Sequence, residues 1–179
     1  MKKVLICLSG MLFCFACAMQ QKEKQKVEDL FLSKVLTGTV FSIDNEKIID
    51  DLPWNPHASF KGVYLKHLIT GKDTDDKLSY HIVKIEPESM LDTHLHDGKI
   101  EIHQVVAGSG KMDLDGKEID YSQGQICIIP ANTPHKVLAG KEGLYILATF
   151  TPALIIRQCK VLKANSSTNA SEKYLPKFA

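Results

Sequence analysis

The stretch that decides the fold is His94-Leu95-His96-Asp97-Gly98-Lys99-Ile100-Glu101, residues 94–101. Side chains two positions apart on a β-strand point to the same face, so His94 and His96 can present their imidazoles to one point. Asp97-Gly98-Lys99 has the composition of a turn, after which Glu101 could return a carboxylate to that point from the paired strand. The stretch therefore predicts two strands joined by a turn, with three candidate ligands facing inward.

A further histidine, His135, follows a long excursion of the chain and the turn 130–134, which begins and ends with proline. Imidazole and carboxylate ligands together suit a divalent transition metal such as Mn, Fe, Ni or Zn. Four protein ligands on an octahedral ion would leave two positions for water or a substrate, and catalysis needs such an open site. The sequence therefore predicts a metal centre made of His94, His96, Glu101 and His135.

The spacing of these residues resembles the two motifs of the cupin family. After His94-Leu95-His96 come four residues, Glu101, six more residues and Gly108, as in H-x-H-x4-E-x6-G. Gly124, five residues, Pro130 and then Thr133-Pro134-His135 similarly follow G-x5-P-x-G-x2-H-x3-N. The chain departs from the motifs at three positions that are not ligands, where Glu88, Asn132 and Ala139 replace Gly, Gly and Asn. Asparagine tolerates a left-handed backbone, so Asn132 can serve the same turn as the glycine.

The resemblance covers about residues 60–152 and implies an all-β protein, a single cupin-type jelly-roll β-barrel. It also implies that the three histidines and the glutamate bind the metal, because family members use them so. Cupins include dioxygenases, sugar isomerases, decarboxylases and lyases, so we expect a metal-dependent enzyme acting on a small carbohydrate or organic acid. The alternative is a module that binds a small ligand without turnover. Many cupins pair through edge strands, which makes a homodimer plausible.

The rest of the chain agrees with an all-β fold, because short apolar runs alternate with turns. Candidate strands cover residues 63–69, 80–85, 100–106, 111–114, 117–120, 125–129, 136–138 and 144–150. Asp115-Gly116 is the strongest hairpin signal among the turns. We also predict that Gly108-Ser109-Gly110 ends one strand and that a turn occupies residues 139–143.

Other histidines need separate interpretation. His103 is two residues beyond Glu101 and should share its inward face. It is our candidate catalytic residue, a proton donor to the substrate or a partner behind the metal ligands, and the alternative is a barrel-filling histidine bonded to a neighbour. His67 and His81 alternate with apolar residues and are interpreted as packed barrel residues. His57 lies in a segment broken by prolines, as does Trp54, and could cap the mouth of the barrel.

The first residues are typical of an export signal. A basic start is followed by an uncharged apolar run to Cys17, which is too short to span a bilayer. In our preferred reading residues 1–16 are a lipoprotein signal peptide, Cys14-Phe15-Ala16-Cys17 is a loose lipobox, and Cys17 is lipidated. The protein would then be a cell-envelope lipoprotein. Cleavage before Met19, which gives a periplasmic or secreted protein, and an uncleaved anchor are the alternatives.

Residues 17–40 are interpreted as a linker, 41–156 as the barrel and 157–179 as a polar tail. The formal net charge is +1, with scattered Lys and Arg, so the basic stripe required for nucleic-acid binding is absent. The partners expected are a small molecule and, through the lipid anchor, a membrane. Beyond the signal only Cys127 and Cys159 remain, and the sequence leaves open whether they form a disulfide.

Overall fold

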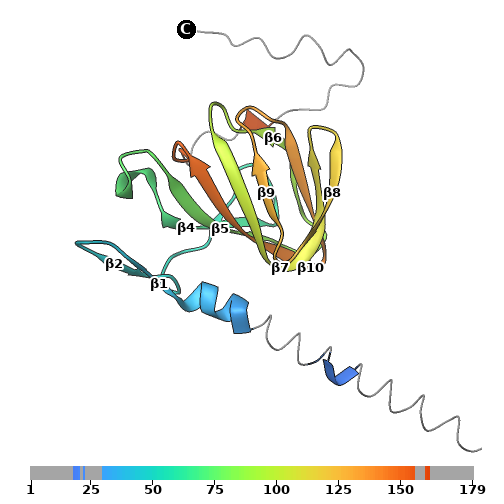
Figure 1. The fold of residues 1–179 in the computed structure, drawn as a ribbon, viewed down its shortest axis with the longest axis horizontal. Coiled ribbons are helices and arrows are strands. Elements are labelled where there is room, and N and C mark those ends of the chain that lie inside the picture. Colours follow the sequence, from blue (N-terminus) through green and yellow to red (C-terminus); the bar gives the residue numbers. More distant parts are fainter. Residues whose placement is uncertain (1–17, 21, 23–29, 156–159, 162–179) are drawn as a thin grey trace, which may run out of the picture.

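A computed structural model describes residues 18–20, 22, 30–155 and 160–161. The signal peptide, Cys17 and Cys159 lie outside these residues, as does most of the tail. Among these residues nine strands form one sheet that makes the barrel, two short strands form a separate sheet, and a helix over residues 30–37 lies outside the barrel (Figure 1). The strands are β1 (Thr39–Phe41), β2 (Glu46–Ile48), β3 (Asn55–Pro56), β4 (Val63–Ile69), β5 (Ser79–Ile85), β6 (Met90–Leu95), β7 (Ile100–Leu114), β8 (Lys117–Ser122), β9 (Ile126–Ile129), β10 (His135–Thr151) and β11 (Lys160–Val161), with a 3-10 helix η1 (Gly71–Asp73) between β4 and β5.

Two long strands, β7 and β10, organise the barrel. The first part of β10 pairs with β6 and with the end of β7, whereas its second part pairs with β5 and with the start of β7. On its other edge β7 pairs with β8 and β9, and β4 extends the sheet beyond β5. Each long strand thereby belongs to both sides of the barrel, which is how a jelly roll closes around its core.

The predicted breaks in these two strands are wrong. The strand does not end at Gly108-Ser109-Gly110, and residues 139–143 are not a turn, because β7 and β10 continue through both segments with a shift in register between Ala139 and Leu144. A Cβ atom on Gly110 would lie only 2.2 Å from the Leu138 carbonyl oxygen. The glycines therefore permit close approach of two bent strands, a role of strand glycines that sequence patterns do not distinguish from a turn.

Other turn predictions are confirmed. Leu114 and Lys117 face each other across the β7–β8 hairpin, and Asp115 and Gly116 between them have φ values of 51° and 85°. Positive φ at both central residues defines the type I′ turn that the Asp-Gly pair favours. Asn132 has a φ of 63°, so it does adopt the left-handed backbone expected where the cupin motif has glycine.

Apolar side chains fill the barrel and also cover part of its outside. The interior cluster includes Val105, Met112, Val137 and Ile146, all nearly inaccessible to solvent. A second cluster on the outer face contains Leu68 and Ile82, against which side chains of the helix 30–37 and of β1 pack. The segment predicted as a linker thus includes a helix that shields the barrel wall. No helix within the described ranges is long and apolar enough to cross a membrane.

Candidate metal centre

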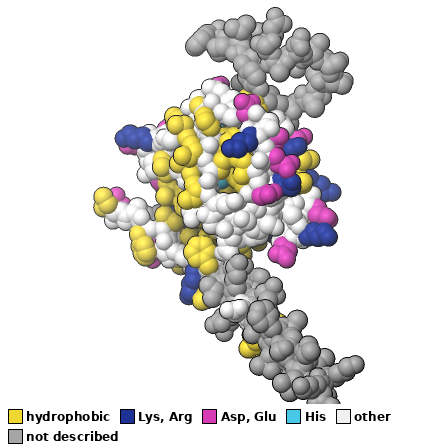
Figure 2. All heavy atoms as spheres, turned by 45° about the vertical axis from the view of Figure 1, so that its right-hand side comes forward, with side chains coloured by type: hydrophobic (Ala, Val, Ile, Leu, Met, Phe, Trp, Pro, Cys, Tyr) yellow, Lys and Arg dark blue, Asp and Glu magenta, His cyan; other side chains and the backbone are white. Residues whose placement is uncertain are grey.

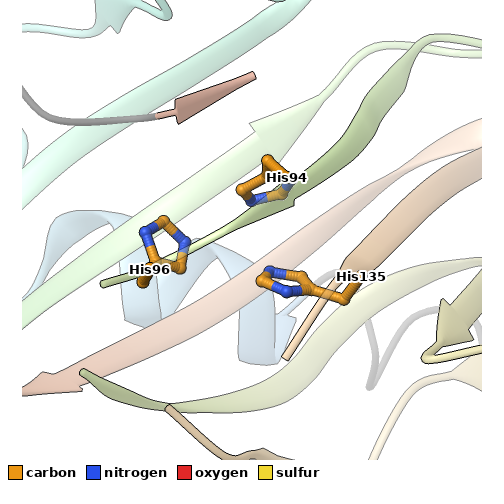
Figure 3. Close-up of side chains that lie close together, drawn as sticks. All are labelled: His94, His96 and His135. Atoms are coloured by element: carbon orange, nitrogen blue, oxygen red, sulfur yellow. The ribbon is translucent and has the colours of Figure 1, made fainter. Parts of the chain in front are cut away.

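Three histidines meet inside the barrel (Figure 3). His94 is near the end of β6, His96 follows directly after it, and His135 opens β10 opposite His94 in the register of the two strands. One ligand nitrogen from each ring lies within 4.8 Å of the others, and all three side chains are buried. The three imidazoles therefore lie close together, and their role as metal ligands stays a prediction.

Backbone carbonyls orient two of these rings. The Nδ1 atom of His94 donates to the carbonyl of Asp92 at 2.7 Å, and that of His135 donates to the carbonyl of Thr133 at 3.0 Å. Since a carbonyl only accepts, each Nδ1 carries the hydrogen, and Nε2 is the nitrogen left to bind a metal. Sequence places each carbonyl two residues before its histidine, so the orientation is built into the local backbone.

Glu101 lies against two of the histidines. Its Oε2 atom is 3.1 Å from His135 Nε2 and 3.3 Å from His96 Nε2, whereas its Oε1 is 2.7 Å from His103 Nε2. Burial alone would raise the pKa of the Glu101 carboxyl, but His103, His135 and His96 outweigh burial and hold that pKa well below its usual range. Glu101 is therefore a carboxylate, as a metal ligand must be.

Electrostatics differ between the histidines. Burial, followed by the charge of His135, lowers the pKa of His94 to about 3, so His94 is neutral and able to donate a lone pair. Burial also acts to lower the pKa of His135, but its contact with Glu101 outweighs burial and raises that pKa. A proton on His135 would therefore compete with a metal ion for the same nitrogen.

Unpaired buried atoms show that the residues fit a metal ion. Within the described part of the chain, His96 Nδ1, Glu101 Oε2 and His135 Nε2 are inaccessible to solvent and have no hydrogen-bond partner. Buried polar atoms are nearly always satisfied, and an unsatisfied one costs about 1–3 kcal/mol. Three such atoms on adjacent side chains, with imidazole and carboxylate chemistry, suit a divalent transition metal.

His103 stands behind Glu101 and faces inward, as predicted. Its Nε2 contacts Glu101, and its Nδ1 is 3.2 Å from the hydroxyl of Tyr121. Both ring nitrogens are thus engaged by the protein, and a catalytic role for His103 stays a prediction. Sequence reasoning missed Tyr121, because it comes 18 positions after His103 on another strand and no local spacing connects the two.

The remaining histidines are not members of the cluster. His67 and His81 are cross-strand neighbours whose Nδ1 atoms are 3.0 Å apart, and they pack in the wall as predicted. His57 Nδ1 accepts hydrogen bonds from the backbone N–H groups of Ser59 and Phe60. The ring of His57 stacks on Phe60 with centroids 4.6 Å apart, and Phe60 is 5.5 Å from the ring of His94.

The proline-broken segment therefore brings His57 beside the cluster through Phe60. Trp54 from the same segment packs instead near Tyr145 in the outer cluster. On the face shown in Figure 2, histidine colour appears only as a small patch among apolar side chains.

Residues 81–150 match the family profile described as cupin domain. This stretch of the chain is therefore similar to a cupin domain. An oxalate-binding protein of Thermotoga maritima is 24% identical over 113 residues, which cover 62% of this chain and 93% of that protein. The matched residues include all three histidines of the cluster, His94, His96 and His135.

Two solved structures share the fold. KdgF from a Halomonas species gives a TM-score of 0.53 at 21% identity and covers 60% of this chain and 92% of its own. A predicted oxalate decarboxylase of Thermotoga maritima gives a TM-score of 0.53 at 23% identity, with coverage of 57% and 95%. These likenesses confirm the cupin-type jelly roll predicted from the sequence.

Proposed function

We propose that the cupin domain binds a divalent transition metal through His94, His96, Glu101 and His135, and acts as an enzyme on a small organic acid or carbohydrate. The observation that carries the proposal is the set of three buried polar atoms without a hydrogen bond on neighbouring candidate ligands. A bound ion would satisfy two of them, Glu101 Oε2 and His135 Nε2, which lie 3.1 Å apart. Mn, Fe, Ni and Zn all suit the ligand set.

The side chains around the cluster favour an acidic ligand. A divalent ion beside the single carboxylate of Glu101 would leave net positive charge in a buried site, which attracts an anion. Phe60 and Phe150 pack against His94 and His96, with ring centroids 5.5 Å and 4.9 Å apart, and exclude water from that side. When bound, the metal supplies Lewis-acid chemistry toward a carboxylate, carbonyl or enediol, or oxygen chemistry if it is iron.

Oxalate is the first ligand to test. The relative described as an oxalate-binding protein and the structural neighbour described as a predicted oxalate decarboxylase both concern this small dicarboxylic acid. Their identities to this chain are low, so they support the class of ligand and leave the reaction open.

Binding without turnover is the second candidate, because both ring nitrogens of His103 are engaged by protein partners. Proton transfer from His103 to a ligand would require it to exchange one of these partners. An enzyme that relies on His103 should lose turnover in His103→Ala while still binding its ligand. A binding module should instead show no product with any metal, in the wild type as in the variant.

The first experiment is metal analysis of the full-length chain, purified without a histidine tag, by mass spectrometry. We expect near-stoichiometric transition metal in the wild type and none in His94→Ala/His96→Ala. His67→Gln is the matched control, since it removes a histidine of the same barrel outside the cluster, and should keep the metal. If every candidate ion fails to bind after reconstitution, the four-ligand assignment is wrong. Calorimetric titration with oxalate and product analysis then separate the two candidates.

Export and lipidation are part of the proposal and rest on the N-terminal sequence alone. We propose that Cys17 carries the lipid and anchors the protein in the cell envelope. Mass spectrometry of membrane-fraction protein should find a lipidated Cys17, and Cys17→Ser should move the protein out of that fraction. A mature N-terminus at Met19 would support ordinary cleavage instead.

A further inference from the structure

The two carboxylate oxygens of Glu101 have different surroundings. Oε1 contacts His103 Nε2 at 2.7 Å, whereas Oε2 faces the cluster and has no hydrogen-bond partner among the described residues. A carboxylate only accepts hydrogen bonds, so the hydrogen of this contact belongs to His103 Nε2. This hydrogen bond therefore selects which oxygen of Glu101 remains free to bind a metal.

The other nitrogen of His103 is matched by a tyrosine. When Nε2 of a neutral imidazole carries the hydrogen, Nδ1 is an acceptor and needs a donor. The Tyr121 hydroxyl is 3.2 Å from Nδ1. Burial, the largest cause, and a hydrogen bond with the Cys127 side chain raise the pKa of Tyr121, so the group stays a protonated hydroxyl. Both side chains are at most 2% exposed, and water does not compete for these positions.

We propose that Tyr121 is a positioning residue of the metal centre, whose hydroxyl holds His103 in the tautomer that carries its hydrogen on Nε2 and so keeps Glu101 oriented with Oε2 free. This inference rests on the proposed metal-binding function and adds to it a residue from β8. Tyr121 acts through His103, to which its hydroxyl is hydrogen-bonded. Partners of this kind typically contribute about 10- to 100-fold to metal affinity.

Removal of the hydroxyl has a specific consequence. In Tyr121→Phe the ring still fills the core, but Nδ1 of His103 becomes a buried acceptor without a donor, which is unfavourable. His103 can relieve this cost by rotating its ring or changing tautomer, and either change removes the fixed hydrogen bond to Glu101. Glu101 then has to be reordered when the metal binds, so affinity falls.

The test combines affinity with spectroscopy on the full-length chain. Zn²⁺ affinity, measured by competition with a chromophoric chelator, should fall about 10- to 100-fold in Tyr121→Phe. Tyr145→Phe is the matched control, because Tyr145 lies in the outer cluster, and its affinity should change by less than about twofold. In the metal-free protein, nitrogen NMR should show His103 with hydrogen on Nε2, and this signature should be lost in Tyr121→Phe.

A double-mutant cycle separates positioning from packing. In a His103→Gln background there is no tautomer to select, so adding Tyr121→Phe should change Zn²⁺ affinity by less than about twofold. An equal loss in both backgrounds, unchanged affinity in Tyr121→Phe, or hydrogen on Nδ1 of His103 would overturn the inference. If the wild type binds no metal, the proposed function fails, while the tautomer measurement on metal-free protein still decides the role of Tyr121.

Discussion

His81 makes the stability of the barrel depend on pH. Its side chain is fully buried, its Nδ1 is 3.0 Å from Nδ1 of His67, and its Nε2 is 2.9 Å from the Ser79 hydroxyl. Burial, and then the charge of His67, lower the pKa of His81 from 6.5 to about 4, with Glu101 acting in the opposite direction. Folding therefore favours the neutral form of His81.

The sign and size of the effect follow from the two pKa values. Because the folded pKa is the lower one, the unfolded chain takes up the proton first as the pH falls. The contribution is fully present above about pH 6.5 and is lost progressively toward about pH 4. Between pH 7.5 and pH 5 the free energy of unfolding should fall by about 2 kcal/mol through His81 alone.

Urea unfolding in the presence of a chelator measures this effect, followed by the fluorescence of Trp54, the single tryptophan of the chain. The comparison is with His81→Gln, whose side chain can still form hydrogen bonds but does not titrate. His94 is present in both proteins, so its contribution to the pH dependence is the same in both and cancels in the difference. The stability advantage of the wild type should shrink by about 2 kcal/mol from pH 7.5 to pH 5. Parallel stability curves for the two proteins would refute the reasoning.

Three other predictions concern different parts of the molecule. Gly110→Ala should lower the free energy of unfolding by about 2 kcal/mol or more, because its Cβ would lie 2.2 Å from the Leu138 carbonyl oxygen. In the same urea assay the control Ser109→Ala, at an exposed position of the same strand, should change the free energy of unfolding by less than about 0.5 kcal/mol. Metal at about 100 times its dissociation constant should raise the melting temperature of the wild type by about 5–10 °C, and an equal rise in His94→Ala/His96→Ala would contradict the assigned ligands. The homodimer expected from the sequence would cover Ile126 and Ile128 of β9, which are 65% and 64% exposed. Light scattering should then give about twice the chain mass of 19.9 kDa, and Ile126→Lys/Ile128→Lys should give a monomer. A monomeric wild type would show the dimer prediction to be wrong.

The features that the sequence predicts well are those fixed by local geometry. His94 and His96 share a face because strand side chains alternate, and the structure places them as expected. The Asp115-Gly116 hairpin depends on the positive φ angles of two adjacent residues, so a dipeptide is enough to predict it. His135 was assigned through its resemblance to the cupin motif. Local patterns alone do not reveal that His135 lies beside His94 and His96, which are far from it in the sequence.

Features set by contacts between distant strands were missed or predicted wrongly. Gly108 and Gly110 look like strand breakers, but pairing with β10 decides that the strand continues. Tyr121 pairs in register with Gly110, and its hydroxyl reaches His103, seven positions earlier on β7, because both side chains point into the barrel. The position of His57 depends on how a proline-broken segment folds over the barrel, and no periodicity encodes that.

The place of β10 in the barrel has a consequence for synthesis. His135 opens a strand that pairs with β5, β6 and β7, so the fourth candidate ligand is synthesised with the strand that joins both sides of the barrel. A growing polypeptide that ends before this strand holds His94, His96 and Glu101 without the framework that brings them together. If the proposed site binds a metal, the metal would therefore bind only after β10 has been synthesised, and a bound ion would indicate a completed barrel.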